Sequence, residues 1–148
     1  MKKSWILVAD SARARIFTTK SPTAPLEELK DLTHIAAKIH DQQLVTDLPG
    51  RHSNDTGIGA HNYEPKVLPT EEEAIMFAKE LAKELKQGFD HHEFEQLYLV
   101  APAHFLGLLK KELDSKIARI VAHTEAKDVA KMSAEEIRKR LPEYLPQL

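Results

Sequence analysis

The sequence predicts one α/β domain in which helices pack on a mixed central sheet. Two short apolar runs, Trp5–Ala9 and Leu97–Ala101, have the uninterrupted hydrophobicity of strands that are buried on both faces. The second run stops at Pro102, and a helical pattern begins directly after it. Strand and helix signals that mix along a chain in this way are typical of a sheet covered by helices. We therefore expect both runs in the middle of the sheet.

Length, composition and charge limit the class of protein. The chain has 148 residues, 42% hydrophobic and 30% charged, which predicts a single domain over residues 1–148. It has 0 Cys and no stretch approaching the ~20 apolar residues of a membrane helix, so we expect a cytoplasmic protein without a membrane partner. Lys2 and Lys3 imitate a signal peptide, but Asp10 and Arg13 cut the apolar run short. A net charge of -2 means that RNA binding would need a local basic patch.

The first third of the chain predicts strands. Asp10-Ser11 follows the first apolar run and predicts a hairpin turn, and residues 12–17 alternate small or apolar side chains with arginines, as in a strand with one wet face. The spacing of Leu26, Leu29 and Leu32 allows a helix, but we predict an extended segment over Leu29–Ile35.

A long loop and a well-signalled helix follow. Residues 48–69 hold a density of glycines, prolines and other turn formers that regular elements do not tolerate, and we predict that segment 50–66 is the most mobile part of the domain. Thr70 and Glu73 form a capping-box pattern at the start of the next helix, and Gly88 is its predicted end.

The last third predicts two more helices and a further strand. A helix is expected over Ala103–Leu113, and Gly107 is predicted to let that helix approach a neighbour. Ile117–Ala122 reads as a strand. The last helix begins with a second capping box at Ser133 and ends before Pro142.

Five motifs, in order over nearly the whole chain, together resemble one protein family. They are WILVADSARARIF at Trp5–Phe17, DLPGR at Asp47–Arg51, FAKEL at Phe77–Leu81, LYLVAP at Leu97–Pro102 and FLG at Phe105–Gly107. The chain closely resembles the bacterial host attachment protein family. That family is similar to the middle domain of archaeal and eukaryotic peptide-chain release factors and of the ribosome-rescue factor Pelota, so the resemblance implies a release-factor middle-domain-like fold and a link to translation.

One motif of the release factors is missing. In those proteins the loop before the long helix carries Gly-Gly-Gln, which enters the peptidyl-transferase centre of the ribosome. The corresponding loop here, residues 50–66, contains Gly57-Ile58-Gly59 instead. This departure argues against peptidyl-tRNA hydrolysis by the release-factor route.

Four residues are candidates for catalysis. Asp10 follows a buried strand and could orient a ligand, activate water or accept hydrogen bonds in a turn, and the last role is favoured. His104 lies in the first turn of a helix beside the end of a strand, where ligands bind in α/β proteins. His52 and His61 lie in the long loop, without the spacing of a zinc motif, so no metal or other cofactor is expected.

Three arginines are candidates for binding. Arg13 and Arg15 share one strand face and Arg51 lies in the loop, where guanidinium groups could hold phosphates. The alternative role for Arg13 and Arg15 is pairing with acidic helices, which would also protect an edge strand. The leading hypothesis is a non-catalytic protein that engages RNA, tRNA or the ribosome through these arginines and loop 50–66. A hydrolase of phosphoesters or tRNA esters and an oligomeric protein-interaction scaffold are the alternatives, and a homo-oligomer stays open.

Overall fold

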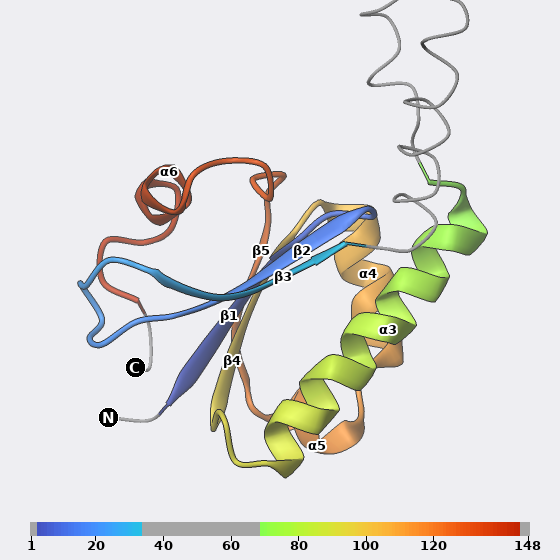
Figure 1. The fold of residues 1–148 in the computed structure, drawn as a ribbon, viewed down its shortest axis with the longest axis horizontal. Coiled ribbons are helices and arrows are strands. Elements are labelled where there is room, and N and C mark those ends of the chain that lie inside the picture. Colours follow the sequence, from blue (N-terminus) through green and yellow to red (C-terminus); the bar gives the residue numbers. More distant parts are fainter. Residues whose placement is uncertain (1–2, 34–68, 146–148) are drawn as a thin grey trace, which may run out of the picture.

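The domain is built on one five-stranded sheet with the strand order β3-β2-β1-β4-β5 (Figure 1). The structure is a computed structural model, and it describes residues 3–33 and 69–145. The strands are β1 (Ser4–Ala9), β2 (Arg13–Thr18), β3 (Glu27–Thr33), β4 (Gln96–Ala101) and β5 (Val121–Ala126). The helices are α3 (Glu71–Asp90), α4 (Ala103–Glu112), α5 (Ser115–Arg119) and α6 (Ala134–Lys139). This is the single α/β domain with a mixed central sheet that the sequence predicts.

The two apolar runs occupy central positions, as predicted. β1 lies between β2 and β4, and β4 lies between β1 and β5. Every residue of both strands is buried, which is the burial that an uninterrupted apolar run requires. β1 and β4 are parallel, with Leu7 opposite Leu99, whereas β1 and β2 form the expected antiparallel hairpin around Asp10.

The extended prediction after the first loop is also confirmed. β3 pairs antiparallel with β2 and begins at Glu27, two residues before the predicted start at Leu29. β3 is an edge strand, and most of its side chains are exposed. The spacing of Leu29 and Leu32, which also allowed a helix, therefore belongs to a strand. The predicted end at Ile35 lies outside the described residues.

Helix α3 starts as predicted and ends later than predicted. The Thr70 Oγ1 atom accepts a hydrogen bond from the Glu73 N–H at 3.1 Å, and the Glu73 carboxylate accepts one from the Thr70 N–H at 2.9 Å. The helix continues past Gly88 to Asp90, so the prediction that Gly88 ends it is wrong. Gly88 packs against Trp5, and an added Cβ atom would lie 2.5 Å from the Trp5 ring. Close packing explains this glycine, because no side chain fits there.

The region after α4 differs from the prediction in two respects. Residues 115–119 form the short helix α5, capped by the Asp114 carboxylate, and the strand begins only at Val121. Ile117 is buried by this helical turn, which explains why its apolar side chain suggested a strand from sequence alone. Gly107 has open space where a Cβ atom would lie, so it does not mediate a close helix approach. The last helix starts at the predicted capping box of Ser133 and Glu136.

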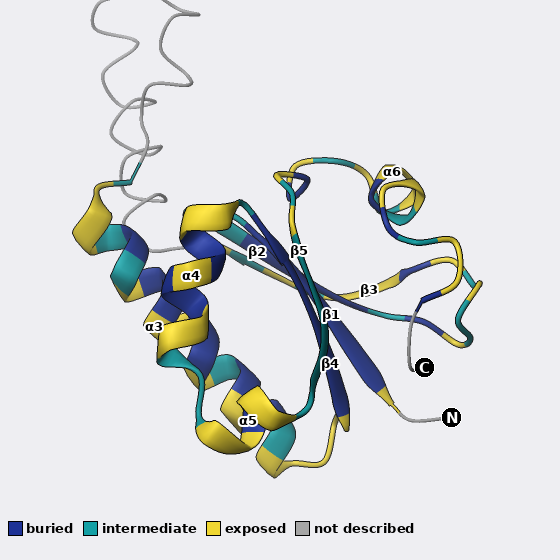
Figure 2. Cartoon of the chain, turned by 180° about the vertical axis from the view of Figure 1, so that it is seen from behind, coloured by how far each residue is buried: buried dark blue, intermediate teal, exposed yellow. Residues whose placement is uncertain are grey.

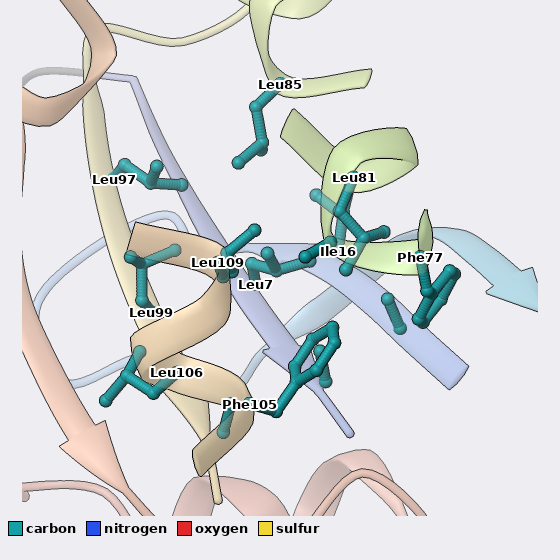
Figure 3. Packing of buried hydrophobic residues seen from close by; sticks show 14 of the residues in the cluster. Leu7, Ile16, Phe77, Leu81, Leu85, Leu97, Leu99, Phe105, Leu106 and Leu109 are labelled. Atoms are coloured by element: carbon teal, nitrogen blue, oxygen red, sulfur yellow. The ribbon is translucent and has the colours of Figure 1, made fainter. Parts of the chain in front are cut away.

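Two apolar clusters lie on opposite faces of the sheet (Figure 2). Helices α3, α4 and α5 cover one face, and Figure 3 shows leucine and phenylalanine side chains of α3 and α4 meeting apolar side chains of β1, β2 and β4. The other face is covered by α6 and the irregular chain around it. That second cluster contains Ile6, Val8, Phe17, Leu26, Tyr98, Val100, Val129, Ala130, Ile137, Leu141 and Leu145.

Candidate functional site

Most of the described candidate residues lie near one edge of the sheet, where β1, β3 and β4 end. These three strands run in the same direction, because β1 and β3 are both antiparallel to β2 and β4 is parallel to β1. Helices α3 and α4 begin at this edge (Figure 1). Strand β3 ends at Thr33, and α3 begins after its cap residue Thr70, so these ends of the two described ranges lie at this edge.

Asp10 holds the turn between β1 and β2. Its Oδ1 atom accepts hydrogen bonds from the N–H groups of Ala12 and Arg13, both at 2.8 Å. This is the arrangement in which an aspartate side chain replaces a backbone acceptor in a turn. One oxygen of the carboxylate therefore has a structural task.

His104 lies on the surface of this edge and pairs with an acidic residue. Its Nε2 atom is 2.8 Å from the Glu71 carboxylate, which joins the first turns of α4 and α3. The side chains of His104 and Glu71 are 71% and 58% exposed. No hydrogen bond between His104 and Asp10 is found among the described residues. His52 and His61 lie outside the described residues, so their distances to this edge stay predictions.

Arg13 is engaged by an acidic residue of the neighbouring strand. Its Nε and Nη2 atoms donate to the Asp31 carboxylate at 3.2 and 2.8 Å, a two-point contact across β2 and β3. These hydrogen bonds lower the pKa of Asp31 and raise that of Arg13. The guanidinium is partly exposed, and its charge is balanced locally.

Arg15 is buried and holds three segments of the chain together. It is 7% exposed, and its Nε and Nη2 atoms donate to the Glu28 carboxylate at 3.0 and 2.9 Å. Its Nη1 atom donates to the carbonyl oxygens of Ala130, at 3.1 Å, and Met132. The hydrogen bonds from Arg15 lower the pKa of Glu28. Arg15 therefore pairs with a carboxylate of strand β3, and not with the acidic helices that the sequence led us to expect. Arg51 lies outside the described residues.

A second group of cations was not singled out from the sequence. Lys110 and Lys111 lie in the last turn of α4, and Lys116 and Arg119 lie on α5; we call these four exposed residues the basic corner. None of them forms an ion pair within residues 3–33 and 69–145. The run of cations in KKELDSKIAR was visible in the sequence, but only the structure shows that all four are exposed and that they lie on two helices that follow each other closely along the chain.

A polar network on the other sheet face was also missed. Glu125 pairs with the His123 Nε2 atom and with the Lys127 Nζ atom, both at 3.1 Å. The ring of His123 lies 6.0 Å from that of Tyr98, whose buried hydroxyl has no hydrogen-bond partner. Burial raises the pKa of Tyr98 to about 12. The signal in the sequence was the spacing of His123, Glu125 and Lys127, which lie two residues apart and so fall on one face of an extended chain.

Membrane-spanning helices and metal-binding clusters are both absent from the described part of the chain. Its helices include none that is both long and apolar enough to cross a membrane. Within the same residues, no three His, Asp or Glu side chains come together in a way that could hold a metal ion.

Comparisons with solved structures give similarities at low sequence identity. The chain is similar to the archaeal translation termination factor aRF1, with a TM-score of 0.49 and 13% identity over 95% of this chain and 35% of that one. A structure described as an archaeal protein has a TM-score of 0.47 at 13% identity, covering 93% of this chain and 36% of its own. The Ppx/GppA phosphatase of Aquifex aeolicus has a TM-score of 0.42 at 14% identity, covering 86% and 36%. This chain thus spans about a third of each of these structures.

The sequence comparisons identify the family. No curated protein matches the chain significantly. The family model Host_attach, whose description is "Protein required for attachment to host cells", matches residues 5–141, which is nearly the whole chain. This chain therefore belongs to the Host_attach family, as its five motifs imply.

Proposed function

We propose that this chain is a non-catalytic binding protein that engages RNA and that the basic corner is its contact surface. The observation that supports the proposal is the set of four exposed cations, within ten residues of chain, that have no acidic partner among the described residues. Cations that no carboxylate neutralises are available to phosphates, and phosphate contacts supply most of the affinity of non-specific RNA binding.

The acidic residues within the corner do not cancel its charge. Glu112 is already paired with Lys79 of α3 at 3.2 Å. The Asp114 carboxylate accepts a hydrogen bond from the Lys116 N–H at 2.9 Å, which caps α5. The charge of Glu112 is therefore balanced by Lys79, whereas the Asp114 carboxylate keeps its negative charge and stands against the four cations. The corner stays locally basic on a chain whose net charge is -2.

The arginines first considered are less suited to this role. Arg15 is buried and binds Glu28 and two carbonyls, so freeing it for a phosphate would disrupt the fold. Arg13 would have to leave Asp31. Arg51 and loop 50–66 stay a second proposed contact, which lies outside the described residues.

The proposed role is non-catalytic, and the contacts and exposure of Asp10 and His104, the two described candidates for catalysis, support it. Asp10 uses one carboxylate oxygen in a turn, and the pair of His104 and Glu71 is open to water. Catalytic acid–base pairs generally act where water is excluded and the electrostatic interaction is strong. An RNA-binding role would connect to attachment to host cells indirectly, through the synthesis of other proteins in the cytoplasm.

The test compares two variants that lose the same charge. The corner variant replaces Lys110, Lys111, Lys116 and Arg119 by Gln. The control variant replaces Lys20, Lys131, Lys139 and Arg140, which are exposed and lie outside α4 and α5. The last three of these also have no ion pair among the described residues, so the control tests whether the position of the cations matters. Filter binding with structured RNA is measured over a range of salt concentrations. If four phosphates are contacted, the wild-type slope of log affinity against log salt is about -3.

The corner variant is expected to lose at least about tenfold in affinity and most of its salt dependence, because each lost phosphate contact lowers the slope by about 1. The control variant is expected to keep both, and thermal unfolding checks that the two variants are folded. Equal losses in both variants would show that only net charge matters, and no binding by the wild-type protein at low salt would overturn the proposal.

A further inference from the structure

We propose that the RNA held at the basic corner is double-stranded and is recognised through its phosphate groups alone, independently of base sequence. This inference rests on the proposed function, and it names the class of RNA. The juxtaposition that carries it is a set of exposed cations on α4 and α5, two helices that have no exposed Phe, Tyr or Trp ring and no amide side chain.

The helical layer offers no exposed Phe, Tyr or Trp ring on which a base could stack, and the exposed imidazole of His104 lies in the first turn of α4, at the opposite end of that helix from the two lysines of the basic corner. Phe77 of α3 is 1% exposed and Phe105 of α4 is 3% exposed. Phe89 of α3 is partly buried and packs against Phe94, with 5.9 Å between the ring centroids. Helix α5 has the sequence SKIAR and contains no aromatic residue. Proteins that bind single strands rely on the stacking of successive bases on aromatic side chains, and the described residues of α4 and α5 offer no exposed Phe, Tyr or Trp ring for it.

The corner also lacks the side chains that read base edges. Neither α4 nor α5 contains Asn or Gln, the residues that form paired hydrogen bonds with bases. In A-form RNA the major groove is too narrow and deep for side chains to reach the bases, and duplex RNA is contacted mainly at its phosphates and at the 2′-hydroxyl groups of the shallow minor groove. Cations without amide side chains beside them are suited to the phosphates. Lysine and arginine side chains at the surface can bind them as point charges or forks.

The arrangement of the cations favours a rigid row of phosphates over a flexible one. Lys116 and Arg119 are three residues apart on α5, which places them on the same side of the helix. Lys110 and Lys111 lie one short turn of chain away, at the end of α4. A duplex presents phosphates at fixed spacing and high charge density, whereas a single strand must lose conformational freedom to match the same four charges.

The experiment measures three RNAs against the wild-type protein and the two variants defined above. The RNAs are a duplex of about 16 base pairs, a second duplex of unrelated sequence, and an unstructured oligouridine of the same length. The expected result is similar affinity for the two duplexes and at least about tenfold weaker affinity for the single strand, with a steeper salt slope for the duplexes. The corner variant is expected to lose duplex binding, and the control variant is expected to keep it.

The outcomes separate this inference from the function on which it rests. If oligouridine binds as tightly as the duplexes and the corner variant loses that binding too, the corner binds RNA but the duplex preference is wrong. A difference of more than about tenfold between the two duplexes would overturn the recognition of phosphates alone. If no RNA binds at low salt, the proposed function and the inference fail together.

Discussion

The two faces of the sheet are covered in different ways. On one face, helices α3, α4 and α5 place apolar side chains against the strands, and ion pairs such as Lys79–Glu112 lie at the periphery (Figures 2 and 3). On the other face, the cover is a six-residue helix, α6, within an otherwise irregular segment. Apolar residues contribute there too, but cations also fasten the segment through its backbone.

Three cationic side chains donate hydrogen bonds to backbone carbonyl oxygens in the irregular chain around α6 or in the loop before β3. Arg15 donates to Ala130 and Met132, and Lys127 donates to the carbonyl of Arg140. Arg138 donates to four carbonyl oxygens, those of Pro22, Ala24, Pro142 and Glu143.

The difference follows from what each cover does with its backbone. A helix satisfies its carbonyl groups internally and can present only side chains to the sheet. An irregular segment leaves carbonyl groups without partners, and burying them requires donors from elsewhere. In this protein, arginine and lysine side chains donate to the carbonyl groups of the irregular cover, whereas the helical cover is held mainly by apolar side chains.

The largest expected effect comes from the helical face. Leu99→Ala should lower the free energy of unfolding by about 2–5 kcal/mol, because Leu99 is 0% exposed and its loss leaves a cavity beneath the helices. Urea titration measures this change. Leu29→Ala, at a side chain that is 49% exposed, should change stability by less than about 0.5 kcal/mol. A loss below about 1 kcal/mol for Leu99→Ala would contradict the assignment of this face as a packed core.

A smaller loss is expected from the cation of the other face. Arg15→Met should cost about 2–3 kcal/mol, since it leaves Glu28 and two buried carbonyl groups without their donor. Arg15→Lys should recover only part of this loss, because an ammonium group cannot reproduce the fork. Arg13→Met is the control, and its partly exposed pair with Asp31 should be worth less than about 1 kcal/mol. Equal costs for Arg13 and Arg15 would break the comparison of the two faces.

Acid should weaken the fastening of the second face. The pKa of Glu28 lies below its usual value of 4.5 because Arg15 donates hydrogen bonds to the carboxylate. The stabilisation is therefore present above pH 4.5 and is lost as the pH falls through the lowered pKa. Urea titrations at about pH 6 and about pH 3 should show a smaller pH-dependent loss for Glu28→Gln than for the wild-type protein. An identical loss in both proteins would show that this pair does not contribute.

The smallest effect concerns Tyr98, whose buried hydroxyl has no partner. Tyr98→Phe should leave stability unchanged or raise it by up to about 1 kcal/mol, because it removes an unsatisfied polar group while keeping the ring. Thermal unfolding measures this change, with Tyr144→Phe as a control at a side chain that is 69% exposed. A loss above about 1 kcal/mol would mean that the hydroxyl makes a stabilising hydrogen bond and that the second face is better satisfied than the contacts indicate.

Local patterns predicted much of the fold. The apolar runs at β1 and β4, the hairpin at Asp10 and the capping boxes at Thr70 and Ser133 are all features whose physical cause lies within a few residues. The strand predicted over Ile117–Ala122 exists but begins only at Val121, because a short apolar stretch fits a turn of helix followed by a strand as well as a strand alone.

The candidate site was less predictable, because charged side chains find partners across the fold. The sequence placed Arg13 and Arg15 on one strand face but could not assign Asp31 and Glu28 to them. The residues of the basic corner could not be singled out from the sequence, because exposed lysines and arginines are common. That they are exposed on α4 and α5 is known only from the fold. His52, His61 and Arg51 lie outside the described residues, so their roles stay predictions.

The sequence by itself determined the class of the domain, its two central strands and the starts of its main helices, because hydrophobic periodicity and capping act over short distances. Only the tertiary structure decided which charges of residues 3–33 and 69–145 are paired with one another and which have no partner within those ranges. Arg15 meets carbonyl groups that are 115 and 117 residues away in sequence, and Gly88 is required by the ring of Trp5. Contacts of that kind depend on how segments distant in the chain are brought together, which no local pattern specifies.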